Sequence, residues 1–153
     1  MQIYAGKDPV KGRETNQSSR VVEDLVKELE NNDRNITCDN CFTRLVLARK
    51  LLSKKTTLVG TTRKNRVEFL SAFTNEKERK VNSTIFGFQK DSMILSYDLK
   101  KNYVVTLMST MYSQPSVDSK GAEKKPEVIT CYNKTKGGVD DSKVAYGYIL
   151  QHD

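Results

Sequence analysis

Histidine is almost absent from this 153-residue chain, which holds a single one, His152, next to its last residue. The chain also has no Ser-His-Asp set, P-loop or HExxH motif, so the common motifs of nucleophilic hydrolysis, nucleotide binding and zinc proteolysis are missing. No apolar run is long enough to cross a bilayer. The first residues lack the apolar segment of a signal peptide. We therefore expect an intracellular protein that neither spans a membrane nor is secreted.

Cysteine is scarce as well, with three residues: Cys38, Cys41 and Cys131. Three thiols in a chain without an export signal predict reduced cysteines and no disulfide framework. Cys38 and Cys41 have the Cys-x-x-Cys spacing of zinc and redox sites. A structural zinc ion needs four ligands, however, and only Cys131 and His152 remain to complete the set. Cys38 also fits a strand pattern, which favours a small buried core residue over a metal ligand.

Basic residues outnumber acidic ones by 26 to 19, which gives a formal net charge of +7. Such a balance favours polyanionic partners without establishing one. The basic residues gather in clusters, and one of these comprises Arg63, Lys64 and Arg66. A charge cluster taken alone is more often a solvated surface than a binding site. With 37% hydrophobic residues, the chain can bury the core of one domain, or of part of a larger one.

Hydrophobic periodicity divides the chain into two kinds of structure. The first part alternates strands and helices, which predicts an α/β fold with parallel pairing at its centre: strands 2–4, 34–38 and 56–61, and helices 20–31 and 42–53. Three later strands with short turns between them predict an antiparallel meander: 84–88, 93–97 and 103–108. Residues 113–126 form a polar loop, and residues 127–132 fit either a strand or a helix.

Two acids stand at positions where chemistry is plausible, Asp39 and Asp140. Asp39 follows the strand 34–38, and a carboxylate at the carboxyl end of such a strand projects into the crevice where α/β folds bind ligands. Asp39 and Asn40 are equally suited to cap the helix expected from Phe42. Asp140 follows a pair of glycines that lets the chain approach a phosphate or metal, but it also suits a helix cap. Judged from the residues alone, the cap is the favoured interpretation of both.

Three long segments together resemble the core of the piggyBac transposase family. They are "NITCDNCFTRLVLARKLLSKKTTLVGTTRKNRVEF", "DSMILSYDLKKNYVVTLMSTMYS" and "KPEVITCYNKTKGGVD". The segments occur in the family's order and with compatible spacing. The similarity extends from "QIYAGK" near the start to Asp140, and "CDNCF", "TLVGTTRKNR" and "YNKTKGGVD" are highly specific in combination.

The resemblance implies an α/β fold that consists of a partial RNase H-like core with an inserted antiparallel β meander. The expected division is core over 1–66, β-rich insertion over 67–112, and a return to the core with a divergent tail over 113–153. Such cores bind two divalent metal ions, here Mg²⁺, through three acids. Asp39 and Asp140 fall on the second and third of these, as catalytic and metal-binding residues. Among the basic clusters, Arg63, Lys64 and Arg66 are the candidates for DNA binding.

The chain departs from the family pattern at several points. The first catalytic acid of the family lies upstream of the segment that resembles "QIYAGK", and Lys143 stands where the family usually has an acid. We therefore expect a fragment of a DDE/D transposase catalytic domain, inactive alone, unstable or poorly soluble by itself, and nuclear. Its partner would be DNA, either transposon ends or non-specific duplex, and the resemblance allows a homodimer of the full-length protein. The alternative is a domesticated, non-catalytic module that binds DNA or protein.

Overall fold

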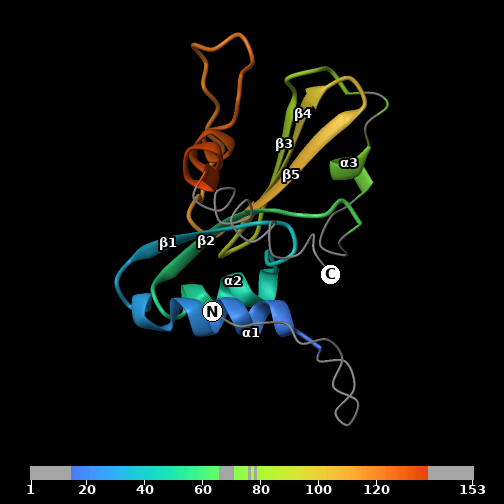
Figure 1. Ribbon diagram of the computed structural model, residues 1–153. Coiled ribbons are helices and arrows are strands. Elements are labelled where there is room, and N and C mark those ends of the chain that lie inside the picture. The colour runs from blue at the N-terminus through green and yellow to red at the C-terminus, as the bar shows by residue number, and fades with distance from the viewer. Residues whose placement is uncertain (1–14, 66–70, 76, 78, 138–153) are drawn as a thin grey trace.

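Five strands form one mixed sheet in the computed structural model, which describes residues 15–65, 71–75, 77 and 79–137 (Figure 1). The order across the sheet is β1-β2-β5-β4-β3. The strands are β1 (Arg34–Cys38), β2 (Thr56–Thr61), β3 (Thr84–Phe88), β4 (Met93–Lys100) and β5 (Tyr103–Ser109). This mixed sheet confirms the α/β class. The strand expected at 2–4 lies outside the described residues.

The parallel half of the sheet is the pair β1 and β2. Arg34 lies opposite Thr56 at one end of the pair, and Cys38 lies opposite Gly60 at the other. Helix α2 (Leu45–Leu52) connects the two strands, as a parallel crossover requires. The β-branched and apolar residues of "TTLVGT" fit the largely buried position of β2.

The antiparallel half consists of β3, β4 and β5, which form the expected meander. It does not stand apart from the parallel pair, because β5 runs antiparallel to β2 with Val59 opposite Ser109 and Thr61 opposite Leu107. The meander therefore continues the same sheet on the other side of β2 from β1. Its strands are slightly longer than predicted, because β4 reaches Lys100 and β5 reaches Ser109.

Each face of the sheet carries its own core, because successive residues of a strand point to opposite sides. Leu58 packs on the side of α2 and α1 (Gln17–Val26), which we call the α1/α2 face, with Val22, Val26, Leu47, Ala48 and Leu51. Val59 packs on the opposite face with Met93, Leu95, Tyr97, Leu107, Val128 and Ile129. The last two belong to residues 127–137, which are helical and lie across the sheet from α1 and α2 (Figure 1).

Helix α2 begins three residues later than the sequence predicts. Its N-cap is Arg44, and the cap makes no side-chain hydrogen bond. The reason is a turn that occupies residues 39–43, in which the backbone N–H groups of Phe42 and Thr43 bond to the carbonyl oxygen of Asp39. The interpretation of Asp39 as the cap of this helix is therefore wrong, and its carboxylate needs another explanation.

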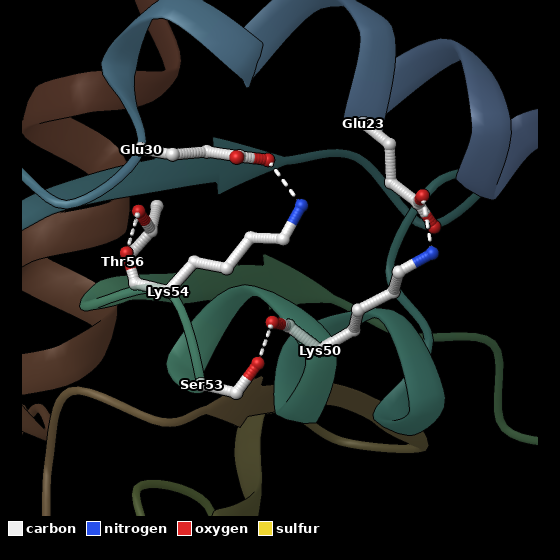
Figure 2. Close-up of polar contacts among 6 residues, drawn as sticks. All are labelled: Glu23, Glu30, Lys50, Ser53, Lys54 and Thr56. Atoms are coloured by element: carbon white, nitrogen blue, oxygen red, sulfur yellow. Dashed lines mark hydrogen bonds and ion pairs between the residues drawn. The ribbon is translucent and has the colours of Figure 1, made fainter.

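Two ion pairs connect α2 and its end to the first helical segment, in which the 3₁₀ turn η1 (Lys27–Leu29) follows α1 (Figure 2). Lys50 Nζ lies 2.6 Å from Glu23 Oε2, and Lys54 Nζ lies 2.7 Å from Glu30 Oε1.

The single helical turn α3 (Ser71–Thr74) lies on the α1/α2 face of the meander. The carbonyl oxygen of its Phe73 accepts a hydrogen bond from the Ser96 hydroxyl. Within the described ranges, no helix is both long and apolar enough to cross a membrane.

Candidate functional site

A tight turn places Asp39 immediately beyond the end of β1. The carbonyl oxygen of Asp39 accepts bonds from the backbone N–H groups of Phe42 (2.9 Å) and Thr43 (3.0 Å), and from the Thr43 hydroxyl (3.0 Å). Gly60 of β2 lies directly against this turn. A Cβ atom at position 60 would overlap the Thr43 hydroxyl and lie 2.8 Å from the carbonyl oxygen of Cys38. The glycine of "TTLVGT" therefore allows the turn to pack closely on β2.

Hydroxyl groups from two other parts of the chain meet near the Asp39 carboxylate. The Thr61 hydroxyl, at the end of β2, donates to Asp39 Oδ1 over 3.5 Å. The Thr61 oxygen also lies 3.4 Å from the Tyr132 hydroxyl, which belongs to the helical residues 127–137. The carboxyl ends of β1 and β2 and one side of this helix therefore converge on a single point.

A further hydroxyl contact attaches the same helix to β1. The Thr37 hydroxyl donates to Thr135 Oγ1 over 2.8 Å, while the Thr135 hydroxyl bonds back to the carbonyl oxygens of Cys131 and Tyr132. Thr37 and Asp39 are two residues apart along an extended strand, so both belong to the opposite face. Helix residues 127–137 are thus held over the end of β1, three positions before Asp140.

Asp39 lines a cavity of about 340 Å³ on the opposite face, between the sheet and this helix. A volume of this size is within the range of small-ligand pockets. Its walls combine Asp39, Thr61 and Tyr132, whose carboxylate and hydroxyls meet as described above, with Lys125 and Lys136. The Lys125 ammonium itself pairs with Glu123. The remaining lining is mostly apolar, from β4, β5 and Ile129.

A second cavity of about 360 Å³ lies on the other side of Thr61, and Asn40, Arg63 and Lys64 are among its lining residues. The two cavities share Thr61, Tyr103 and Val105 as wall residues. The structure therefore brings two members of the predicted basic cluster into a cavity that adjoins the one lined by Asp39. Arg66, the third member, lies outside the described residues.

The Cys-x-x-Cys spacing does not form a metal or redox pair. Cys38 is buried in the core of the α1/α2 face, whereas Cys41 is exposed. Burial, together with the charge of neighbouring Asp39, raises the pKa of the Cys38 thiol to about 12. Since metals and disulfide exchange require the thiolate, Cys38 is suited to neither role near neutral pH. Its position agrees with the predicted role as a core residue.

Carboxylate oxygen is the ligand type that hard divalent cations prefer, and Asp39 presents it at the wall of a cavity. The other predicted metal ligand, Asp140, lies outside the described residues. Within the ranges that the structure describes, no three His, Cys, Asp or Glu side chains gather as they would around a metal ion. The chemistry and position of Asp39 therefore fit a metal ligand. A metal site shared by Asp39 and Asp140 remains a prediction.

Little in the sequence pointed to the hydroxyl groups around Asp39. Thr37 and Thr61 are β-branched strand residues that need no function to explain them. Residues 127–132 fitted either a strand or a helix, so the sequence did not place Tyr132 on a helix beside Asp39. One usable signal was the alternation of side chains along a strand. If residues 34–38 form a strand, Thr37 and the following Asp39 are expected on the same face of the sheet.

Comparisons with known proteins agree with this architecture. Residues 1–148 match a family model described as Transposase IS4. A solved structure, the cryo-EM structure of a piggyBac transposase synaptic complex with hairpin DNA, is similar with a TM-score of 0.78 and 33% sequence identity. The match covers 90% of this chain and 29% of that transposase, so the chain spans less than a third of its length. No curated protein sequence matches significantly.

Proposed function

This chain belongs to the Transposase IS4 family, as a domain of the piggyBac type, and we propose that it forms part of a catalytic domain that cuts and joins DNA strands. The similar piggyBac transposase is bound to hairpin DNA, and we extend DNA as a partner to this chain. One observation carries the proposal. Asp39 stands at the carboxyl end of a parallel strand on the wall of a cavity, and Arg63 and Lys64 line the adjoining cavity.

We propose that Asp39 and Asp140 hold Mg²⁺. When bound, the ion would polarise a phosphoryl oxygen and activate water or a DNA 3′-hydroxyl. The Thr61 hydroxyl orients the Asp39 carboxylate by donating to Oδ1. Arg63 and Lys64 bind backbone phosphates of DNA, in the role that the sequence also assigns to Arg66. In this proposal Asp39 and Asp140 are the catalytic residues, and Thr61 is a positioning residue.

The same proposal includes the domain division, the cellular location and the dimer expected from the sequence. Residues 1–66 and 113–153 belong to the catalytic core, and residues 67–112 form the insertion. A DNA-cutting protein of this family would act in the nucleus, and a dimer of the full-length protein would present two such sites.

DNA binding is the first property to measure, because both catalytic and non-catalytic versions of the proposal require it. We expect the chain to bind duplex DNA at low salt. The logarithm of its binding constant should fall linearly with the logarithm of the salt concentration, with a slope set by the number of phosphates contacted. Replacing Arg63 and Lys64 by glutamine should reduce that slope by about 2, because roughly one counterion is released per phosphate contact. Fluorescence anisotropy of a labelled duplex over a salt series measures both quantities.

The matched control replaces Lys27 and Lys55 by glutamine. These exposed lysines lie away from the candidate site, in η1 and just before the start of β2, and the double variant loses the same charge. It should keep the salt slope of the original chain. Equal losses in the two double variants would contradict a DNA surface at Arg63 and Lys64, and no binding at low salt would overturn the proposed function.

Metal binding separates the catalytic proposal from the domesticated, non-catalytic alternative. We expect Mg²⁺ or Mn²⁺ to raise the melting temperature of the chain, and Asp39→Asn to remove that increase while Glu28→Gln keeps it. Glu28 is an exposed acid in η1, away from both cavities. The alternative predicts salt-sensitive DNA binding with no metal effect at Asp39. The inactivity expected from the sequence is tested in parallel, because Mg²⁺-dependent nicking that requires Asp39 would contradict it.

A further inference from the structure

Tyr103 is a large aromatic residue that the proposed function leaves unexplained. It is the first residue of β5 and follows the short turn after β4, in which Asn102 has a positive φ of 60°. Its side chain is far from buried, since 47% of the residue surface is exposed. It lies across the hairpin from Lys100. The simplest role would be local packing within this hairpin.

Two ammonium groups lie close to the Tyr103 ring. Lys100 Nζ is 5.4 Å and Lys64 Nζ is 5.6 Å from the ring centroid. Lys100 belongs to the hairpin itself, but Lys64 comes from the segment after β2, so hairpin packing does not account for its approach. Both cations therefore lie within cation–π distance of the same ring. An arrangement that gathers them beside one exposed aromatic ring is suited to an anionic ligand that has a flat face.

The position of Tyr103 points in the same direction. Its side chain lines both cavities, the one that contains Asp39 and the one that contains Arg63 and Lys64. Tyr103 alternates with Val104 and shares the opposite face with Val105 and Leu107. Tyr103 therefore stands where the two cavities meet, in a wall of the cavity that Asp39 also lines.

We propose that Tyr103 stacks on one unpaired nucleobase of the DNA strand bound at this site, while Lys64 and Lys100 bind the flanking phosphates. The proposal rests on the proposed DNA-binding function. Aromatic side chains bind single strands by stacking on bases, whose flat faces are covered by neighbouring pairs within a duplex. An ammonium group gains more from a phosphate than from an exposed ring, so each lysine can leave the Tyr103 face when the base arrives.

The test compares three DNA probes that differ in one feature. The first is a blunt 20-base-pair duplex. The second carries a four-thymidine 3′ overhang, and the third carries four abasic units in place of the thymidines, with the same phosphates. We expect the full chain to bind the thymidine overhang about tenfold more tightly than the abasic one, a difference that reports base stacking alone.

Three variants locate the effect. Tyr103→Phe should keep the preference for thymidine over abasic units, because it keeps the ring. Tyr103→Leu should abolish the preference for thymidine over abasic units, because it removes the ring but keeps apolar bulk at an exposed position. Phe88→Leu is the matched control, since Phe88 is similarly exposed, at 44%, but lies on β3 at the far edge of the sheet. It should behave as the original chain.

The outcomes separate the two proposals. If the blunt duplex binds but thymidine and abasic overhangs bind equally, the stacking site is wrong and the DNA-binding function stands. The stacking site is also wrong if Tyr103→Leu retains the preference, or if it weakens all three probes alike with an unchanged melting curve. If no probe binds at low salt, both proposals fail.

Discussion

The two faces of the sheet are built from the same strands but differ in how completely they are covered. On the α1/α2 face, Leu58 packs under two helical segments that are further connected by ion pairs (Figure 2). On the opposite face, Val59 packs under residues 127–137, and the cavity beside it is lined by a carboxylate, hydroxyls and lysines. Beneath α1 and α2 the first face is packed by apolar contacts, and its cavity of about 260 Å³ lies to the side, towards α3 and β3. The opposite face keeps a carboxylate and hydroxyls beside open space under its covering helix. We infer that stability is concentrated on the first and ligand binding on the second.

Thiol reactivity gives the largest expected contrast. Cys38 is buried on the α1/α2 face with a pKa of about 12, and Cys41, three residues later, is exposed. At pH 8 the thiolate fraction of Cys38 is about a thousandfold below that of an unperturbed cysteine, and burial slows the reaction further. We expect iodoacetamide to label Cys41 rapidly and Cys38 only in denaturant, as mass spectrometry of peptides would detect. Equal labelling of both in the native chain would show that this face opens readily.

The same raised pKa has a consequence for stability. Because the thiol of Cys38 ionises less readily in the folded chain than in the unfolded one, ionisation favours unfolding. Its contribution to the free energy of unfolding is fully present below about pH 9 and is lost as the pH rises towards 12. Comparing the original chain with Cys38→Ala over this range isolates the contribution, since the variant should lose less stability between the two pH values.

Core truncations compare the two faces directly. Leu51 is fully buried on the α1/α2 face, and Leu51→Ala should lower the free energy of unfolding by about 3–4 kcal/mol, since a well-packed site leaves a cavity. Ile129 also belongs to a core, but it lines the existing cavity on the opposite face. Ile129→Ala should cost about 2 kcal/mol, at the lower end of such substitutions. Urea denaturation measures both, and a larger loss at Ile129 would reverse the comparison.

These contrasts follow from features that the sequence predicted unevenly. The apolar, β-branched run "TTLVGT" correctly predicted β2, and strand–helix alternation correctly predicted its parallel pairing with β1. Local pattern failed at residues 39–43, because the turn is stabilised by close packing on Gly60, which only the strand register brings near. The same limit applies to Asp39, because Thr61 and Tyr132 are distant in sequence and meet it only through the register and the docking of a helix.

Arg79 tests a third region, the part of the α1/α2 face that lies under the meander. Its guanidinium donates to Ser96 Oγ (2.6 Å) and to the carbonyl oxygens of Ser96 (2.9 Å) and Ser83 (3.0 Å). Nearby Asp98 is fully buried, and neither of its carboxylate oxygens has a hydrogen-bond partner among the residues that the structure describes. Burial lowers the pKa of Arg79, and the charge of Asp98 opposes this. We infer that the Arg79 guanidinium offsets part of the charge of the buried Asp98 carboxylate, although its hydrogen bonds go to Ser96 and Ser83.

We expect Arg79→Ala to lower the free energy of unfolding by about 2 kcal/mol, because it removes these hydrogen bonds and leaves Asp98 without its counter-charge. Adding Asp98→Asn to that variant should restore part of the loss, since the uncompensated charge is then gone. Thermal denaturation of the single and double variants measures both effects. If the second substitution adds a further loss of similar size, Arg79 does not act through Asp98.

The smallest expected effect concerns the two ion pairs drawn in Figure 2, which differ in exposure. The side chains of Lys54 and Glu30 are 37% and 14% exposed, and those of Lys50 and Glu23 are 52% and 27% exposed. Water and salt screen the more exposed pair more strongly, so its coupling should be about 0.3 kcal/mol and that of Lys54 with Glu30 about 1 kcal/mol. Both estimates come from double-mutant cycles with methionine at the lysine and glutamine at the glutamate, so that the length of each side chain is kept.

The Lys54 pair has a second reason to be the stronger one. The backbone N–H of Asn31, next to Glu30, donates to the carbonyl oxygen of Lys54 over 2.8 Å. This bond fixes the two chain segments beside each other, so the ion pair loses less side-chain freedom when it forms. Raising the salt concentration to 1 M should bring the two coupling energies together, because the Debye length then falls to about 3 Å. Couplings that are equal at low salt, or that differ equally at both concentrations, would show that exposure does not set the strength of these pairs.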